Sequence, residues 1–88
     1  MDVRELESKL QKEGYTHTYV WKDASEVFYP NHTHPGETAH IILDGQMTLT
    51  MNGKSEVYYP GDRCDVPAQA VHSALMGPKG CEYLIGEK

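Results

Sequence analysis

Turn-forming dipeptides interrupt most of this chain at short intervals. They include Pro35-Gly36, Asp44-Gly45, Asn52-Gly53, Pro60-Gly61 and Gly77-Pro78. The runs between them are rich in aromatic and β-branched side chains, which favour strands. A parallel sheet would need helical crossover segments between its strands, and these runs do not resemble them. The spacing therefore predicts an all-β, antiparallel sandwich or barrel of about eight short strands.

The expected strands can be placed by alternation and by the turns that bound them. They are 15–21, 25–29, 37–43, 46–51, 54–59, 63–66, 71–76 and 81–85. Because Asp-Gly and Asn-Gly are strong hairpin signals, we expect tight turns at residues 44–45 and 52–53. Met47, Leu49 and Met51 alternate with polar residues, so we expect this apolar set to face the interior or a dimer contact.

The beginning of the chain has a different periodicity and predicts one short α-helix. Val3, Leu6 and Leu10 recur at helical spacing. Asp2 is expected to cap this helix, and Gly14 is expected to stop it. We therefore expect a single domain over residues 1–88, with the helix in 1–14 and a β-barrel in 15–88.

The charge and the hydropathy pattern limit the possible partners. The 88 residues include 8 basic and 13 acidic side chains, for a formal net charge of −5. Nucleic acids select for clusters of Lys and Arg, so we expect no nucleic-acid partner. No apolar run is long enough to span a bilayer, and the charged first residues lack the apolar segment of a secretion signal. We therefore expect a cytoplasmic protein without a membrane partner.

Two groups of residues keep more than one interpretation. Cys64 and Cys81 are expected to be reduced thiols buried as small apolar residues, but Arg63 beside Cys64 also allows an activated thiol. The aromatic residues before the histidines fit the core, a pocket wall or a subunit interface, since all three are enriched in such side chains. These aromatic residues are Tyr15, Tyr19, Trp21, Phe28 and Tyr29.

Histidines are the strongest candidates for chemistry. His32 and His34 are spaced i, i+2, which on an extended chain places both side chains on one face, about 7 Å apart along the backbone. Two imidazoles in that position can converge on one ion. His40 lies in the next expected strand, and His72 begins another strand more than thirty residues later. The pair alone is weak evidence, because a histidine on a strand is usually solvated or hydrogen bonded.

Two segments around these histidines resemble the two motifs of the cupin superfamily. The first motif reads HxH, a few residues, Glu, six residues, Gly, and the run from His32-Thr33-His34 to Gly45 resembles it. The second reads G, five residues, PxGxxH, and the run from Gly61 to His72 resembles it with Pro67 in register. The resemblance covers roughly residues 15–85 and implies a small jelly-roll β-barrel that pairs as a homodimer.

The chain departs from these motifs at two positions. The family's glutamate falls at Thr38, and Gln69 replaces the glycine of the second motif. Glu37 would point to the opposite face of a regular strand, although a bulge could rotate it inward. His40 lies two residues beyond Thr38 and keeps the inward parity. We therefore prefer His40 to Glu37 as the fourth ligand, and both remain open.

The resemblance implies one divalent transition metal bound by His32, His34, His72 and His40. Imidazole donors suit Zn, Fe, Mn, Ni or Cu, and the sequence does not choose among them. The implied function is a metal-dependent enzyme, of the dioxygenase or isomerase type, that acts on a small polar molecule. No catalytic residue is assigned. Two alternatives are a non-catalytic cupin that binds or senses a small molecule, and a structural metal site with no open position.

Overall fold

The computed structural model describes all 88 residues as one helix followed by six strands. The elements are α1 (Val3–Lys12), β1 (His17–Asp23), β2 (Phe28–His32), β3 (Thr38–Met51), β4 (Lys54–Tyr58), β5 (Arg63–Val66) and β6 (His72–Glu87). Every strand pair is antiparallel. The structure contains no helix with the length and apolar character needed to cross a membrane.

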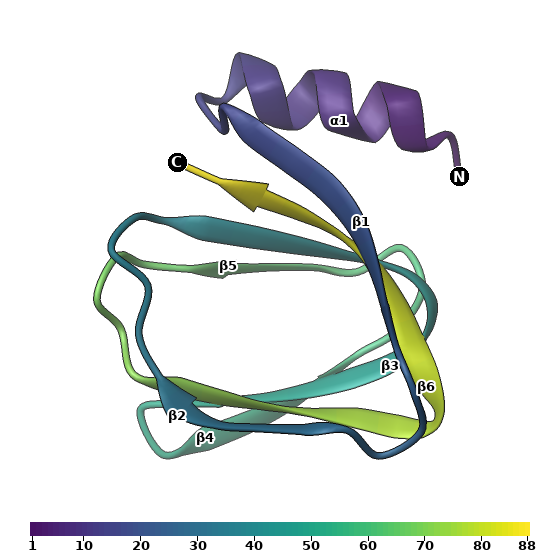
Figure 1. Ribbon diagram of the computed structural model, residues 1–88, viewed down its shortest axis with the longest axis vertical. Coiled ribbons are helices and arrows are strands. Elements are labelled where there is room, and N and C mark those ends of the chain that lie inside the picture. The colour runs from purple at the N-terminus through teal and green to yellow at the C-terminus, as the bar shows by residue number, and fades with distance from the viewer.

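The two longest strands, β3 and β6, pair with each other and organise the sheet. β6 also pairs with β1 and β2, and β3 also pairs with β4 and β5. The register between β3 and β6 shifts twice between Ile42 and Met47, where both strands bend. The first half of β3 and the second half of β6 form one layer with β1 and β5, and the remaining halves form a second layer with β2 and β4 (Figure 1). This arrangement confirms the predicted antiparallel jelly roll.

The bend also shows why the sequence predicted too many strands. The expected strands 37–43 and 46–51 are one strand, β3, and the expected strands 71–76 and 81–85 are one strand, β6. Gly45 has a φ of +78°, and a Cβ there would collide with the carbonyl oxygen of Gly80 in β6. Gly45 therefore lets β3 bend against β6. The hairpin predicted at Asp44-Gly45 is wrong, whereas the turn at Asn52-Gly53 between β3 and β4 is confirmed.

The main apolar core lies between the two layers. Its residues come from both halves of β3, both halves of β6, and β5, so it joins the layers. They are Ile42, Met47, Leu49, Cys64, Val66, Ala74, Met76, Cys81, Tyr83 and Ile85. Met47 is 2% exposed and Leu49 is 4% exposed, so the alternating apolar set predicted in this strand faces the interior.

Helix α1 lies against the outside of the layer that contains β1 (Figure 1). Leu10 is fully buried there in a second apolar cluster, against which Val3 and Leu6 also pack. The Asp2 side chain accepts hydrogen bonds from the backbone N–H groups of Arg4 and Glu5, and thus satisfies two donors that the helix leaves unpaired. The predicted apolar face and the predicted cap are therefore both confirmed.

Candidate metal centre

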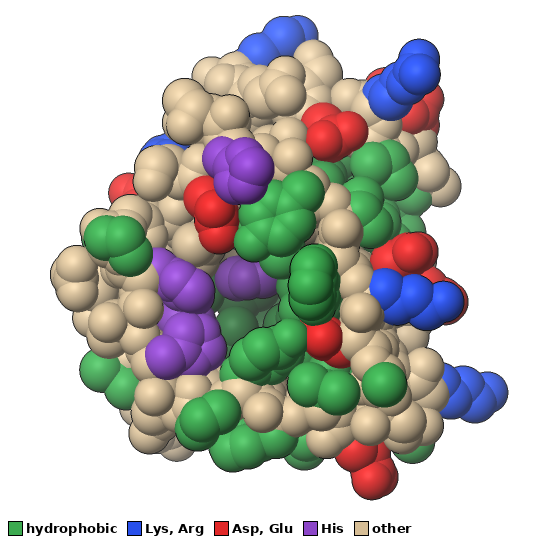
Figure 2. Space-filling model, in the orientation of Figure 1, with side chains coloured by type: hydrophobic (Ala, Val, Ile, Leu, Met, Phe, Trp, Pro, Cys, Tyr) green, Lys and Arg blue, Asp and Glu red, His purple; other side chains and the backbone are tan.

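A pocket with a volume of about 480 Å³ opens between the two layers. Figure 2 shows this hollow with histidines along one side and hydrophobic and aromatic side chains along the other. Met47, Leu49, Ala74 and Ile85 supply the aliphatic part of the lining. The polar groups of the pocket are therefore held next to an apolar surface, where electrostatic interactions are stronger than in bulk water.

Three histidines from separate parts of the chain meet at one side of this pocket. His32 ends β2, His34 follows in the loop, and His72 begins β6, where it is the register partner of His32. One ligand nitrogen from each side chain lies within 4.8 Å of the other two. The ring centroids are 4.2 Å apart for His32 and His72 and 5.2 Å apart for His34 and His72. The structure thus brings the HxH pair and the distant histidine together.

Backbone carbonyls define the tautomer of two of these rings. Nδ1 of His32 lies 2.7 Å from the carbonyl oxygen of Pro30, and Nδ1 of His72 lies 2.9 Å from that of Ala70. A carbonyl oxygen only accepts, so each Nδ1 carries the proton and each Nε2 keeps a free lone pair. Metal-binding imidazoles are commonly oriented by such hydrogen bonds. The donor set therefore fits a divalent transition metal.

His34 is held in the neutral form that a metal ligand needs. Burial lowers the pKa of His34 below its ordinary value, and the neighbouring His32 and His72 lower it further. A proton on any one imidazole would repel a proton on the others, because the three rings are so close. The cluster is thus prepared to bind a cation through nitrogen lone pairs at neutral pH.

His40 lines the same pocket but is outside the three-residue cluster. Burial, together with the charge of His72, lowers the pKa of His40 to about 4. Nδ1 of His40 and Oγ1 of Thr38 are both buried without a hydrogen-bond partner. Such unsatisfied groups are rare in folded proteins and are expected to have a partner in the functional state. A ligand role for His40 stays a prediction.

Glu37, the alternative fourth ligand, is directed away from this pocket. Its carboxylate accepts a hydrogen bond from Nζ of Lys88 at 2.9 Å, and its side chain is half exposed. The next residue, Thr38, is only 3% exposed and lines the pocket. Strand alternation therefore places Thr38 inward, as predicted, and the structure does not bring Glu37 to the histidines.

A buried carboxylate that sequence reasoning missed holds three aromatic residues of the pocket lining, Trp21, Tyr29 and Tyr83. Asp23 is 8% exposed, and its Oδ1 accepts hydrogen bonds from Nε1 of Trp21 at 2.9 Å and from the Tyr29 hydroxyl at 2.8 Å. Its Oδ2 accepts a hydrogen bond from the Tyr83 hydroxyl at 2.7 Å. Three charge-assisted hydrogen bonds hold these aromatic side chains in fixed positions. Trp21 and Tyr29 thus belong to the pocket wall, one of the places that the sequence left open.

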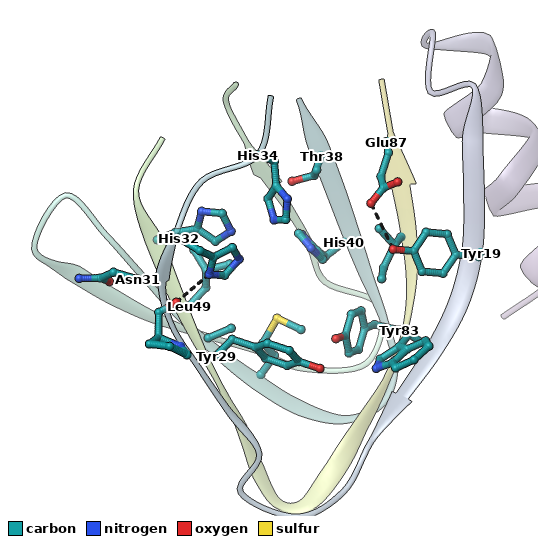
Figure 3. Close-up of a pocket in the computed structure, with 16 residues that line it drawn as sticks. Tyr19, Tyr29, Asn31, His32, His34, Thr38, His40, Leu49, Tyr83 and Glu87 are labelled. Atoms are coloured by element: carbon teal, nitrogen blue, oxygen red, sulfur yellow. Dashed lines mark hydrogen bonds between the residues drawn. The ribbon is translucent and has the colours of Figure 1, made fainter. Parts of the chain in front are cut away.

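Glu87 is a second carboxylate that the sequence did not indicate. It lines the pocket near the end of β6 and accepts a hydrogen bond from the Tyr19 hydroxyl at 3.1 Å (Figure 3). The register places Glu87 directly opposite Thr38. Alternation along the strand could have found it, because Tyr83, Ile85 and Glu87 share one face. The expected strand 81–85 ended two residues before Glu87, so the prediction did not include this residue.

The cysteines do not contribute to this site. Cys64 and Cys81 are buried and unpaired. Burial raises the pKa of Cys64 and raises that of Cys81 to about 11, so both thiols are protonated at neutral pH. The guanidinium of Arg63 is occupied by the carboxylates of Glu13 and Asp65. The buried-core interpretation is therefore confirmed, and the activated thiol is wrong.

The fold and the site define a small jelly-roll protein with a histidine cluster that could hold a metal ion. A family model of the cupin domain matches residues 15–84, which is most of the chain. This chain therefore belongs to the cupin family. No curated protein is significantly similar to it in sequence.

Solved cupin structures share this architecture. A cupin superfamily protein from Desulfitobacterium hafniense superposes with a TM-score of 0.73 and 21% identity, over 80% of this chain and 63% of that chain. DMSP lyase DddQ from Ruegeria pomeroyi superposes with a TM-score of 0.74 and 26% identity, over 81% of this chain and 36% of that chain. KdgF from a Halomonas species superposes with a TM-score of 0.67 and 18% identity, over 81% of this chain and 67% of that chain. This chain thus covers less than two thirds of the first two proteins.

Proposed function

We propose that this cupin binds one divalent transition metal through His32, His34 and His72, and acts as a metal-dependent enzyme on a small polar molecule. The observation that carries the proposal is the free Nε2 on two of the rings, within a cluster whose ligand nitrogens lie within 4.8 Å of one another. His40, with its unpartnered Nδ1 in the same pocket, is the proposed fourth ligand. The pocket beside the cluster supports an open site that a substrate reaches.

The chemistry that we propose is of the isomerase or dioxygenase type. When bound, the metal supplies a Lewis acid for a carbonyl or enediol oxygen, or activates dioxygen. The aliphatic lining of Met47 and Leu49 excludes water from the reacting molecule. The Glu87 carboxylate lies across the pocket from the histidines and is the one acidic side chain of the lining, so it recognises the end of the substrate farthest from the metal. The structural similarity to DMSP lyase DddQ, an enzyme by its name, supports a catalytic role.

Histidine substitutions test metal binding directly. We expect His72→Ala to lose the metal in elemental analysis of protein purified without added metal. His40→Ala loses it only if His40 is a ligand, and His17→Ala, which changes a histidine outside the pocket, keeps it. Bound metal also stabilises the fold, by about 4 kcal/mol when the free ion is at a thousand times its Kd. Equal melting temperatures with and without a chelator at neutral pH would contradict the proposal.

A non-catalytic binding or sensing role is the second candidate. The observation that favours it is Thr38, because a hydroxyl cannot act as the carboxylate that the first cupin motif places at this position. Both candidates use the same pocket and the same metal. A ligand that is bound tightly and recovered chemically unchanged from the metal-loaded protein would favour binding over catalysis.

We also propose that the chain forms a homodimer through the outer face of the layer that contains β2 and β4. The register places Phe28 opposite Leu75, Leu75 opposite Thr48, and Thr48 opposite Val57, so these side chains form one uncharged row across four strands. Phe28 is 59% exposed, and Leu75 and Val57 are each 43% exposed. Two copies that each carry a net charge of −5 can meet there without direct repulsion. Light scattering should give a dimer mass that Leu75→Glu reduces to that of a monomer.

A further inference from the structure

We propose that the pocket wall facing the histidines is a subsite for a cationic group, formed by Glu87, Tyr19 and Trp21. The ligand class is then a small zwitterion, with a carboxylate at the metal and a methylated ammonium or similar cation at this wall. Figure 3 shows Tyr19 and Glu87 across the pocket from His32 and His34. The carboxylate end of this inference rests on the metal site proposed above, and the cation subsite does not.

The charges around the pocket favour a cation at this wall. No Lys or Arg lines the pocket, and Glu87 is its one acidic lining residue. Oε2 of Glu87 accepts a hydrogen bond from the Tyr19 hydroxyl, while Oε1 of Glu87 accepts no hydrogen bond from the protein. His17 is the register partner of Glu87 in β1 and lies outside the pocket lining. Inside the pocket, a ligand anion at this wall would meet a carboxylate that no Lys or Arg offsets, whereas a cation would be attracted.

The aromatic side chains of the wall also suit a cation. The polar hydrogens of Trp21, Tyr29 and Tyr83 are directed to the buried carboxylate of Asp23. These three residues therefore line the pocket with aromatic rings and have no free donor left to offer a ligand. Ring surfaces attract cations, and methylated ammonium groups in particular, because the face of an aromatic ring is negative. Asp23, which accepts these three hydrogen bonds, places a second carboxylate at the edges of the rings.

Thr38 provides independent evidence that a ligand spans the pocket. Its hydroxyl is buried without a partner, and the residue is 3% exposed. It is the register partner of Glu87, and Figure 3 shows it between His34 and Glu87. A buried hydroxyl without a hydrogen bond is costly. A molecule that reaches from the imidazoles to Glu87 would pass this hydroxyl and could satisfy it.

The rest of the lining argues against a polyol. A polyol needs donors and acceptors along its whole length, but Met47, Leu49, Ala74 and Ile85 of the lining are aliphatic, and Thr38 offers a single hydroxyl between His34 and Glu87. Methyl and methylene groups would be buried there favourably. The pocket therefore combines charged or polar recognition at both ends with aliphatic lining and a single hydroxyl between them.

Matched ligand pairs test this subsite by calorimetry. Glycine betaine and 3,3-dimethylbutanoate have the same shape and carboxylate, and differ in a trimethylammonium against a neutral tert-butyl group. The longer pair is 4-(trimethylammonio)butanoate and 5,5-dimethylhexanoate. In at least one pair we expect the charged member to bind about tenfold more tightly. In Glu87→Gln this ratio falls toward one, while the Kd of the neutral member is unchanged. Glu82→Gln is the matched control: it changes the net charge by the same amount as Glu87→Gln but lies outside the pocket, so the affinity ratio should be unchanged.

The outcomes distinguish this inference from the proposed function. Elemental analysis of the same samples reports the metal, and the ratio within each pair is measured with and without it. Metal binding without preference for the charged members overturns the subsite alone. Preference for the charged members without bound metal supports the subsite and contradicts the metal site. Absence of binding by all four compounds, or tighter binding of succinate or a polyol than of the zwitterions, overturns the subsite. If Glu87→Gln fails to fold, the affinity ratio measured on the wild-type protein decides the outcome.

Discussion

Replacing Tyr83 with phenylalanine would delete a single oxygen atom from the buried wall of the pocket. The Tyr83 hydroxyl donates to Oδ2 of Asp23 at 2.7 Å, and no other group of the protein donates to that oxygen. Burial raises the pKa of Tyr83, and the hydrogen bond to Asp23 raises it further, so the phenol stays protonated. Tyr83→Phe therefore leaves one oxygen of a buried carboxylate without a donor.

The expected loss follows from the exposure of the two groups. Tyr83 is 5% exposed and Asp23 is 8% exposed, so water does not readily replace the missing hydroxyl. A hydrogen bond to a charged group contributes about 1.5–3 kcal/mol, and the phenylalanine ring preserves the packing. We expect the free energy of unfolding to fall by about 2 kcal/mol. Tyr29→Phe should cost less, because Trp21 still donates to Oδ1 of Asp23.

Urea denaturation followed by circular dichroism measures this loss. Tyr59→Phe is the matched control, because Tyr59 is 53% exposed and its hydroxyl makes no hydrogen bond within the protein. We expect the free energy of unfolding of the control to fall by less than about 0.5 kcal/mol. The urea m values of the wild type, Tyr83→Phe and the control should be similar. If Tyr83→Phe lost no more stability than the control, the buried carboxylate would not depend on this hydroxyl, and the account of the pocket wall would be refuted.

Two further predictions concern His40 and Gly45. Burial holds the pKa of His40 at about 4, against 6.5 for an ordinary histidine, so the unfolded chain takes up a proton first as the pH falls. Stability of the metal-free protein should be full above about pH 6.5 and about 3 kcal/mol lower near pH 4. In urea titrations with chelator, His40→Gln should flatten this slope, and an unchanged slope would contradict the assignment. Gly45→Ala should destabilise the fold more than Gly53→Ala, because both positions have positive φ but only a Cβ at Gly45 meets the Gly80 carbonyl. Equal losses would rule out this contact as the reason for glycine.

Features that depend on neighbouring residues could be predicted from the sequence. The Asp2 cap, the apolar face of α1 and the Asn52-Gly53 turn each depend on residues that are close together in the sequence. The inward direction of Thr38 and the outward direction of Glu37 follow from alternation along a single strand. These predictions hold because a local backbone conformation by itself sets the direction of each side chain.

The number of strands could not be predicted in the same way. Asp-Gly indicates a hairpin when the two flanking strands pair with each other, but here both flanks pair with β6. Gly80 approaches Gly45 from β6, thirty-five positions along the chain, and the two strands bend together. An Asp-Gly dipeptide therefore predicts a hairpin only when its flanks pair with each other, and at Asp44-Gly45 the distant strand β6 pairs with both flanks instead.

The candidate site shows the same division. The spacing of His32 and His34 determines that both side chains can face one side, and the residue types determine that they can bind a metal. The meeting of this pair with His72, and of Thr38 with Glu87, follows from the register between strands that are far apart in the sequence. Strand direction is a local property of the backbone, whereas pairing and register depend on which apolar faces are buried together, so only the tertiary structure assembles the pocket.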